Sequence, residues 1–530
     1  MTKINNTNLH DKQTLETDIC IIGAGISGQI VASKIEKKKI ILIDSGSVKY
    51  NANTQELNKF ESSGHKFRAN HINRMRQLGG SANLWANQLM FLEKLEIEDR
   101  DWIDKNLSWP IDYKELESNY KEGLENVFDN KIYDFYNQNK KKNDSKIFNE
   151  SFFINNNISF KNHIWPSKVE KFDNKSKFTK KLLKKKNIFF LENSTLIKIN
   201  IDNESQLIKN IELRSTDKTI NIKSKIFVLA CGAIENARII LNNLKNNKIL
   251  ENDNLGRYLM DHPRLNLGIL NSKKKLPLSV FFGHKFSNFD FRKSISLSHS
   301  LQKEMKLLSS HVYIDPFFGE KNDELFEEFL NDLKGIIKLK SLPKFKFRGI
   351  GFRKLIEQIY FKLPPQVSSS ILNNLIRLII SNKKYHLSFL NMKINYQGEQ
   401  KPNYDSKITL SNKKDKFDQN ISDIDWKFDK IDHDGYLEFT KIIKNIFKDN
   451  PNFTFEENIN KEITDASHHS GTTRMSISKN DGVVDKNLKF HTLKNLFISG
   501  NSVFRTIGSG NPGLTNIALS NRLGKYINNL

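Results

Sequence analysis

The segment TDICIIGAGISGQIVASKIEKKKIILIDSG, residues 17–46, decides which fold this chain can adopt. Two apolar runs, at 19–22 and 40–43, enclose a glycine-rich turn and a helix-like stretch. The glycines are Gly23, Gly25 and Gly28, and the second run is followed by Asp44. Glycines at this spacing permit a tight turn and close approach of the backbone to a pyrophosphate, while the acid can bind a ribose hydroxyl. We therefore predict a strand–helix–strand unit that binds a dinucleotide, with the helix N-terminus facing the phosphates.

A second segment, near the C-terminus, carries groups suited to chemistry. SHHSGTTRM, residues 467–475, places the pair His468 and His469 shortly before Gly471. About forty residues later, after an apolar run that predicts a buried strand, a glycine-rich turn leads into Asn511 and a proline. A histidine can accept a proton, and an amide can polarise the same oxygen. This combination can oxidise an alcohol if a hydride acceptor lies nearby.

Composition limits the other function classes. A chain of 530 residues suggests two domains, or one with insertions, and 38% hydrophobic residues can supply a core. The net charge of +24 comes mostly from lysines scattered along the chain. Solvated lysine surfaces are one explanation; an anionic substrate or an anionic membrane surface are others. We expect no nucleic acid partner, because the usual nucleic-acid-binding motifs are missing from the sequence.

Only two cysteines occur, Cys20 and Cys231, so no disulfide framework, zinc spacing or haem motif can be built, and we expect no metal. The N-terminal residues contain no apolar run or arginine pair typical of a secretion signal, and no segment is long and apolar enough for a membrane helix. The sequence therefore favours a cytoplasmic protein.

The middle of the chain contains further elements of the same fold. Short alternating segments in 187–224 predict a small antiparallel layer, and an apolar run at 226–230 leads into Gly232 and a second helix. A loop with Gly79, Gly80, Ser81 and Asn83 could approach a flavin or a phosphate. Asp112 is placed to cap a helix. Residues 396–411 predict a strand, a Pro-Asn turn and a second strand. The basic, amphipathic stretch 326–380 predicts either a helical cap or a contact with an anionic membrane surface.

No linker separates the halves of the chain, so the dinucleotide domain is predicted to be discontinuous. We assign 1–16 to a polar tail and 17–110, 190–266 and 463–530 to the dinucleotide domain. The remaining segments, 111–189 and 267–462, form a substrate or cap domain. The predicted fold class is α/β, a Rossmann-like domain with an α+β substrate domain built on an antiparallel sheet.

Taken together, these segments resemble the glucose-methanol-choline (GMC) oxidoreductases, a family of flavoenzymes, and in particular bacterial sugar and sugar-acid dehydrogenases and pyranose oxidases. The matching segments follow the family order from residue 18 to the C-terminus. They are GAGISG with Asp44, GGSANLW, SWPIDYKEL, LACGAIENARIIL, NLGRYLMDHPR, EQKPNYDSKITLS, HHSGTTRM, GVVDKNL and GNSVFRTIGSGNPGLTNIAL.

The resemblance implies FAD as cofactor and a role for each matching residue. His468 would be the base that takes the hydroxyl proton, with a pKa near neutrality, while hydride passes to the flavin. Asn511 would hydrogen-bond the developing alkoxide. His469 could point away from the flavin. The residues implied in FAD binding are Gly23, Gly25, Gly28, Asp44, Gly79, Gly80, Ser81, Asn83, Gly500, Asn501 and Thr515.

Two departures from the family pattern bear on function. Leu84 stands before Trp85 where some relatives tether the flavin through a histidine, so we expect non-covalent FAD. Arg505 stands where many relatives have proline, and together with the positive net charge it favours an anionic or acidic-sugar substrate. The expected substrate is a small alcohol or sugar; the sequence does not indicate the electron acceptor.

Three alternatives stay open at this point. One is a non-redox lyase of the same fold that acts through His468. Another is an FAD-binding protein of membrane surfaces without turnover. The third is a nicotinamide-dependent dehydrogenase, which would have no need of the C-terminal GNPGLT segment.

Overall fold

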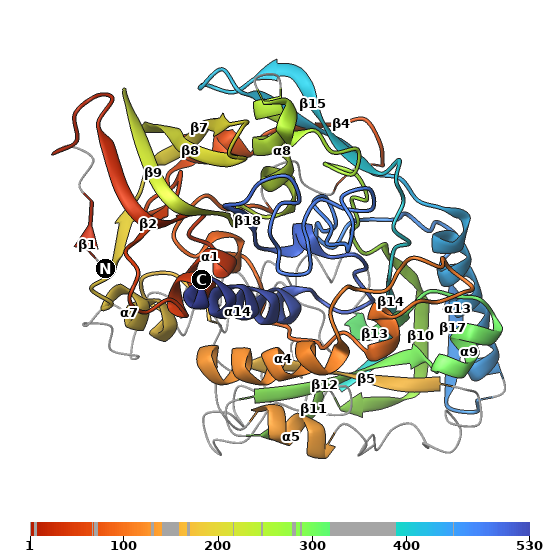
Figure 1. The fold of residues 1–530 in the computed structure, drawn as a ribbon. Helices are drawn as coiled ribbons and strands as arrows, with labels where there is room; N and C mark the ends of the chain where they lie inside the picture. Colours follow the sequence, from red (N-terminus) through yellow and green to blue (C-terminus); the bar gives the residue numbers. More distant parts are fainter. Residues whose placement is uncertain are drawn as a thin grey trace, which may run out of the picture.

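The computed structural model describes residues 2–4, 8–65, 67, 73–128, 132–139, 158–166, 170–215, 217–244, 247–277, 282–286, 289–317, 388–448 and 450–530. The whole basic stretch 326–380, and with it the membrane contact suggested for it, lies outside the described residues, as does the rest of 318–387. The described residues form three sheets with helices around them (Figure 1). This confirms the α/β class with an additional antiparallel sheet.

The first sheet contains the predicted dinucleotide unit. Its parallel strands, in spatial order, are β1 (Thr2–Lys3), β6 (Ile188–Leu191), β3 (Ile40–Ile43), β2 (Thr14–Ile22), β9 (Lys218–Leu229) and β18 (Leu496–Ile498). The apolar runs predicted as strands at 19–22, 40–43 and 226–230 all lie in it. Strands buried on both faces need continuous apolar sequence, which these runs supply.

Strand β9 has both antiparallel and parallel neighbours in the first sheet. Its first half pairs antiparallel with β8 (Leu207–Ser215), which pairs with β7 (Ser194–Asp202), and its second half pairs with β18. The predicted antiparallel layer is therefore correct for β7, β8 and β9. It is wrong for 188–191, because β6 is a parallel strand beside β3. Likewise β2 begins at Thr14, inside the segment expected to be a tail.

Three helices pack against one another beside this sheet, with α14 (Gly513–Asn529) between α1 (Ile26–Ser33) and α4 (Tyr113–Val127) (Figure 1). Asp112 caps α4 through the backbone N–H of Lys114, as predicted. Helix α8 (Ala233–Asn243) follows β9. The shorter helices are α2 (Ala52–Gln55), α3 (Lys94–Ile97), α5 (Ile132–Asn139), α7 (Lys177–Leu183) and α9 (His299–Glu304), with 3-10 turns at Glu56–Asn58, Gly80–Asn83, Lys248–Leu250 and Asn501–Val503.

The second sheet is antiparallel throughout. Its strands are β11 (Phe282–Phe286), β12 (Phe289–Leu297), β13 (Ser310–Phe317), β14 (Ser388–Gly398), β10 (Arg264–Pro277) and β17 (Phe453–Glu457), with β5 (Ile158–Pro166) beside β12. Helix α13 (Lys430–Lys448) covers one face. Its Phe439 and Ile443 share a core with Val312 and Ile394 of the strands. The other face of this sheet carries polar side chains.

A third, small sheet joins β15 (Lys407–Lys414), β16 (Asn420–Asp425) and β4 (Phe60–Ser62). The strand, turn and strand predicted for 396–411 correspond to the end of β14, the turn that follows it and β15. Among the helices of the described segments, none is both long enough and apolar enough to cross a membrane.

Candidate active site

A cavity lies where the parallel strands end at their carboxyl side. Its walls come from the loops after four of them: Gly23 after β2, Asp44 after β3, Gly232 after β9 and Gly500 after β18. Ligands of open α/β sheets bind at this edge because the loops of several strands converge there. The lining residues that the sequence predicted are Gly23, Gly25, Asp44, Gly80, Ser81, Gly500 and Asn501.

The backbone of this cavity requires glycine at defined positions. Gly23 has φ +106°, and a Cβ there would lie 2.4 Å from the carbonyl oxygen of Ala230. A Cβ on Gly28 would lie 1.9 Å from the Gly23 carbonyl oxygen, so Gly28 permits the contact between helix and turn although it does not line the cavity. Gly232 has φ +82° and open space where its Cβ would stand. A concave surface of bare backbone therefore faces the cavity.

Asp44 organises the turn beneath this surface. Its carboxylate accepts backbone N–H groups of Ala24 at 2.9 Å and Gly46 at 2.7 Å. Burial raises the pKa of Asp44, while these two hydrogen bonds and Arg76 act in the opposite direction. A carboxylate has about four acceptor positions, so lone pairs remain for a ribose hydroxyl.

The predicted loop at residues 79–83 lies against the dinucleotide turn. Gly79 pairs with Gly25 in an isolated bridge, and Gly80 and Ser81 line the cavity. Asn83 does not line it, because its side-chain amide donates to the carbonyls of Leu78 and Gly80 within the loop.

Thr515 lies away from the cavity, contrary to the prediction. Its hydroxyl is 2.7 Å from the Tyr120 hydroxyl in the contact between α14 and α4. The next residue, Asn516, lines the cavity instead and accepts a hydrogen bond from Ser27 at 2.8 Å. Asn501 also lines it, and its buried Oδ1 has no partner among the described residues.

Charged residues on the cavity wall were missed by the sequence analysis. Arg76 and Arg238 each lie 2.9 Å from a carboxylate oxygen of Glu235. Although burial raises the pKa of Glu235, these arginines hold it at about 2. Glu235 therefore stays ionised and neutralises part of the arginine charge. Glu235 was quoted only as part of the helix after Gly232, and no local pattern indicates its partners.

The loop carrying the histidine pair is held by a single buried carboxylate. Asp261 accepts the backbone N–H groups of His262 at 2.7 Å, Ala466 at 3.0 Å and His468 at 2.8 Å. The two segments also pair directly, Met260 with Ser470 and Arg264 with Thr464. Asp261, which the sequence analysis quoted only within NLGRYLMDHPR, thus ties the loop of the histidine pair to the start of β10.

His468 lies in a partly exposed position between two cavity-lining residues, Ser467 and His469. Its ring packs edge to face on His262, with centroids 5.2 Å apart, and its buried Nδ1 has no partner among the described residues. Burial, followed by His262 and Arg264, holds the pKa of His468 well below its usual value. The expected pKa near neutrality is therefore wrong, and the ring is neutral at physiological pH.

His469 does not point away from the cavity but lines it. Its Nε2 is 3.8 Å from Asp261, and its ring packs on Phe67. Burial and the nearby Arg74 lower the pKa of His469 to about 4.

Asp261, Asp465 and His469 bring three possible metal-ligand atoms within 4.8 Å of one another. The two carboxylates are already committed, however. Asp261 holds three backbone amides, and Asp465 accepts the backbone N–H and hydroxyl of Ser467 at 3.0 Å each. Burial, and then Asp465, raise the pKa of Asp261 to about 8. The group therefore serves to shape the histidine loop.

Asn511 is held on both sides by glutamines that the sequence analysis missed. The amide of Gln397 donates to the Ser509 carbonyl at 2.9 Å and to Asn511 Oδ1 at 3.1 Å. Asn511 Nδ2 then donates to Gln88 Oε1 at 3.1 Å. Because a carbonyl can only accept, the Ser509 contact fixes which end of Gln397 faces Asn511, and hence which way the Asn511 amide points. One N–H of Asn511 remains for another acceptor.

The hydrogen bonds that orient the Asn511 amide continue to the second sheet. Gln88 Nε2 contacts the hydroxyl of Tyr313 at 3.0 Å and Nδ1 of His163, whose Nε2 contacts Ser294 at 2.6 Å. Since an amide N–H₂ is a donor, His163 accepts through Nδ1 and carries its proton on Nε2. A chain of hydrogen bonds, each with a defined donor and acceptor, thus runs from Ser509 to Ser294 of β12.

His262 links the two halves of the site. Its Nδ1 lies 3.1 Å from the carbonyl of Gly398, the neighbour of Gln397, and its Nε2 faces the carbonyl of Gly510 without forming a well-directed hydrogen bond. His468 and Asn511 are therefore connected through one buried imidazole, although no local sequence pattern brings them together.

Arg505, predicted to favour an anionic substrate, is buried and fully engaged. Its guanidinium lies 2.6 Å from Asp481 and donates to the carbonyls of Asn106 at 2.6 Å and Met475 at 3.2 Å. Arg505 therefore holds neighbouring loops together, and its positive charge is not available to an anionic substrate.

Comparisons with known proteins agree with this architecture. Residues 402–520 match the family model of the C-terminal region of GMC oxidoreductases. An R554A variant of formate oxidase from Aspergillus oryzae RIB40 shares 14% identity over 98% of this chain and 99% of its own, with a TM-score of 0.56. Pyridoxine 4-oxidase from Mesorbium loti shares 13% identity over 97% and 99%, also with a TM-score of 0.56. No curated protein sequence matches the chain.

Proposed function

We propose that the chain is an FAD-dependent oxidoreductase of the GMC family that oxidises a CH–OH group, with His468 as base. The match of residues 402–520 to the family model supports this proposal. The observation that carries this proposal is the position of a neutral histidine, His468, between two residues that line the glycine-rich cavity. The solved relatives named above are oxidases, which supports the reaction class.

The cavity residues fit an FAD molecule. Bare backbone at Gly23, Gly232 and Gly500 leaves room for the pyrophosphate. Asp44 can accept from the adenosine ribose, and Asn501 presents an unpartnered acceptor. Leu84 has no nucleophilic atom with which to tether the flavin, so the cofactor is held without a covalent bond there. When bound, FAD supplies the acceptor for the hydride of the carbinol carbon.

His468 takes the hydroxyl proton in this mechanism. A general base must be unprotonated before it acts, and the low pKa of its ring ensures this at neutral pH. The Asp261 side chain holds the backbone that carries this ring, by accepting the His468 backbone N–H. His468 would thus start the oxidation of the alcohol neutral and end that step protonated, and it would release this proton before the next turnover.

Asn511 stabilises the oxygen as it loses its proton. Its Oδ1 and one N–H are held by Gln397 and Gln88, so the other N–H can donate to the developing alkoxide. Donors that are already oriented lower the barrier because they need no reorganisation during the reaction. Gln88 and Gln397 are positioning residues for this amide.

We propose a sugar or sugar derivative as the substrate, since amides and hydroxyls from Gln88, Tyr313 and Asn511 suit several hydroxyl groups. The FAD-binding part comprises 17–110, 190–266 and 463–530, and the substrate part 111–189 and 267–462. The FAD-binding and substrate parts interlock, because α4 packs on α14 and because β10 begins at Arg264.

The test is an anaerobic visible spectrum of the purified protein, repeated with aldoses, sugar acids, polyols and simple alcohols. We expect a yellow protein whose flavin absorbance bleaches with one class of compound. A colourless protein that takes up no FAD would contradict the proposal, and reduction of added nicotinamide dinucleotide would favour that alternative. A yellow protein that none of these compounds bleaches would count against the redox role and for the lyase.

The neighbouring histidines provide a matched pair of variants. We expect His468→Ala to slow bleaching by about 10²–10⁴-fold while FAD remains bound, because the base is lost. His469→Ala should weaken FAD retention more than the rate of bleaching, since His469 lines the cavity. If only His469→Ala abolished bleaching with FAD retained, the assignment of the base would be wrong.

A further inference from the structure

The polar face of the second sheet carries a row of side chains that crosses five strands. Ser159 pairs with Ser296, Ser296 with His311, His311 with Gln397, and Gln397 with Arg264. Directly opposed residues of neighbouring strands project from the same face of a sheet. Because Gln397 holds Asn511, this row lies beside the catalytic groups, and Arg264 stands next to Gln397.

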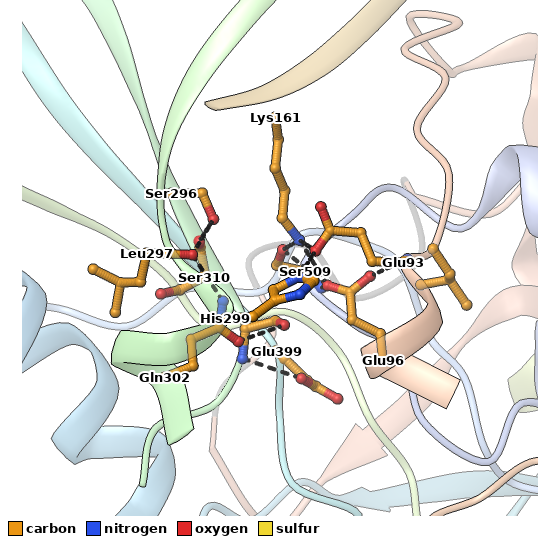
Figure 2. Close-up of polar contacts among 12 residues, drawn as sticks. Glu93, Glu96, Lys161, Ser296, Leu297, His299, Gln302, Ser310, Glu399 and Ser509 are labelled. Atoms are coloured by element: carbon orange, nitrogen blue, oxygen red, sulfur yellow. Dashed lines mark hydrogen bonds and ion pairs between the residues drawn. The ribbon is translucent and has the colours of Figure 1, made fainter. Parts of the chain in front are cut away.

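Most buried charges near this face are neutralised within the protein. Figure 2 shows Lys161 reaching from β5 to Glu96 at 2.8 Å and Glu93 at 3.4 Å. Lys161 also donates to Ser509 at 2.9 Å. Arg100 is paired with Glu399 by two short hydrogen bonds. These cations already have partners and cannot recognise a substrate charge.

Arg264 differs from these cations. It is partly exposed, and its hydrogen bonds to described residues all run through its backbone, to Thr464. Its guanidinium has no carboxylate or other hydrogen-bond partner within the described segments. Burial is the main cause of the lowered pKa values of His262, His311 and His468, and the positive charge of Arg264 contributes to each, so Arg264 lies near all three rings.

The neighbouring His311 adds a second unsatisfied group. It is fully buried in the row, and neither ring nitrogen has a hydrogen-bond partner among the described residues. Buried polar groups normally have partners, so an unpaired one calls for a ligand or water that completes it. A neutral imidazole offers one donor, and a guanidinium offers five in a planar arrangement that matches a carboxylate.

We propose that Arg264 binds the carboxylate of an anionic hydroxy compound and that this class of compound is the substrate. His311 lies at the same subsite. The inference rests on the oxidation proposed above, and it replaces Arg505 with Arg264 as the source of a preference for anions. The carboxylate would orient the carbinol carbon toward His468 and Asn511.

The experiment compares hydroxy acids with neutral counterparts in anaerobic flavin bleaching. Suitable pairs are gluconate with glucitol, lactate with propane-1,2-diol, and glycolate with ethylene glycol. We expect a hydroxy acid to bleach the wild type. In Arg264→Gln the concentration for half-maximal bleaching should rise on the order of 100-fold, with the rate at saturation changed only a few-fold. The response to the neutral counterpart should be unchanged.

Two further variants make the result specific. Arg264→Lys keeps the charge but loses the planar pair of donors, so it should recover part of the affinity. Arg214→Gln removes the same charge from β8 in the other sheet and should behave as the wild type. An equal effect of Arg264→Gln on acid and neutral compounds, or no effect on the acid, would overturn the proposal.

Malonate, a carboxylate without a hydroxyl group, separates this proposal from the oxidation itself. If malonate perturbs the flavin spectrum in the wild type but not in Arg264→Gln, the anion site stands even if no compound bleaches the flavin. If neutral alcohols bleach the flavin and neither malonate nor any hydroxy acid depends on Arg264, the anion site is wrong and the oxidation stands.

Discussion

The two large sheets place functional groups in different ways. In the parallel sheet, the residues proposed to bind the cofactor lie in the loops at the strand ends, where Gly23, Gly232 and Gly500 line one cavity. In the antiparallel sheet, the residues proposed to bind the substrate lie along the face of the strands, and register brings His311, Gln397 and Arg264 into one row. Functional residues of the first kind form local sequence motifs, whereas those of the second kind depend on pairing between distant segments.

The largest expected effect concerns the charges of the antiparallel sheet. Lys161→Met should destabilise the protein by about 3–5 kcal/mol, because Glu96 would be left buried without its partner. Chemical denaturation would measure this change. The control is Lys94→Met, which breaks the exposed pair with Glu98 and should change stability by less than about 1 kcal/mol. An equal loss of stability in both variants would mean that the buried ion pairs of Lys161 do not stabilise this sheet more than an exposed pair does.

In the parallel sheet the sensitive positions are in the backbone. Gly23→Ala should cost about 2–4 kcal/mol and prevent FAD retention, because the new methyl group meets Ala230 at a strained φ. Gly25→Ala is the matched control, since Gly25 has φ −74° and its Cβ would lie 3.6 Å from Gly80. Thermal unfolding measured without FAD would distinguish the two, since Gly25 also lines the cavity and FAD content therefore does not isolate the steric effect. Similar losses in both variants would contradict the steric argument.

The orientation of Asn511 can be tested from the substrate side. Gln88→Leu should lower the rate of flavin reduction about 10–100-fold with little change in substrate affinity, because the Asn511 amide would lose its acceptor. Gln302→Leu removes a buried glutamine bonded to Leu297 and Ser309, away from Asn511. It should reduce stability without this loss of rate. An equal loss of rate in Gln88→Leu and Gln302→Leu would mean that Gln88 supports the fold and does not orient Asn511.

The smallest effect is a shift in pH dependence. The rate of flavin reduction should fall only in the acidic range, as His468 becomes protonated, and be flat at neutral pH and above. In Arg264→Gln this acidic fall should move to higher pH, because removal of the positive charge raises the pKa of His468. A pH profile of the reduction rate at saturating substrate measures both. A fall centred on neutrality in the wild type would contradict the lowered pKa of His468.

The sequence was most informative where backbone geometry imposes a residue type locally. Gly23 and Gly28 are needed within a few residues of each other, so their spacing predicts the turn and the sheet around it. The error at Thr515 is one position along α14, since the start of a helix does not show which side chain faces a neighbouring cavity.

The residues that were missed belong to contacts between distant segments. Gln397 is 114 positions from Asn511, and Gln88 is 423 positions from it. Arg264 is the last residue of the quoted segment NLGRYLMDHPR, but nothing in that segment shows that its guanidinium has no carboxylate partner among the described residues. The strand β6 was assigned to the wrong layer for a related reason, because a short apolar run can pair in either direction.

The shared strand β9 has a consequence for biosynthesis. It lies between β2, from the start of the chain, and β18, which ends at Ile498. The central sheet therefore cannot close while the ribosome is still making the chain up to that point, and its non-local pairing predicts slow folding. Until then, the second half of β9 presents an unpaired apolar edge of the kind that chaperones protect and that otherwise leads to aggregation.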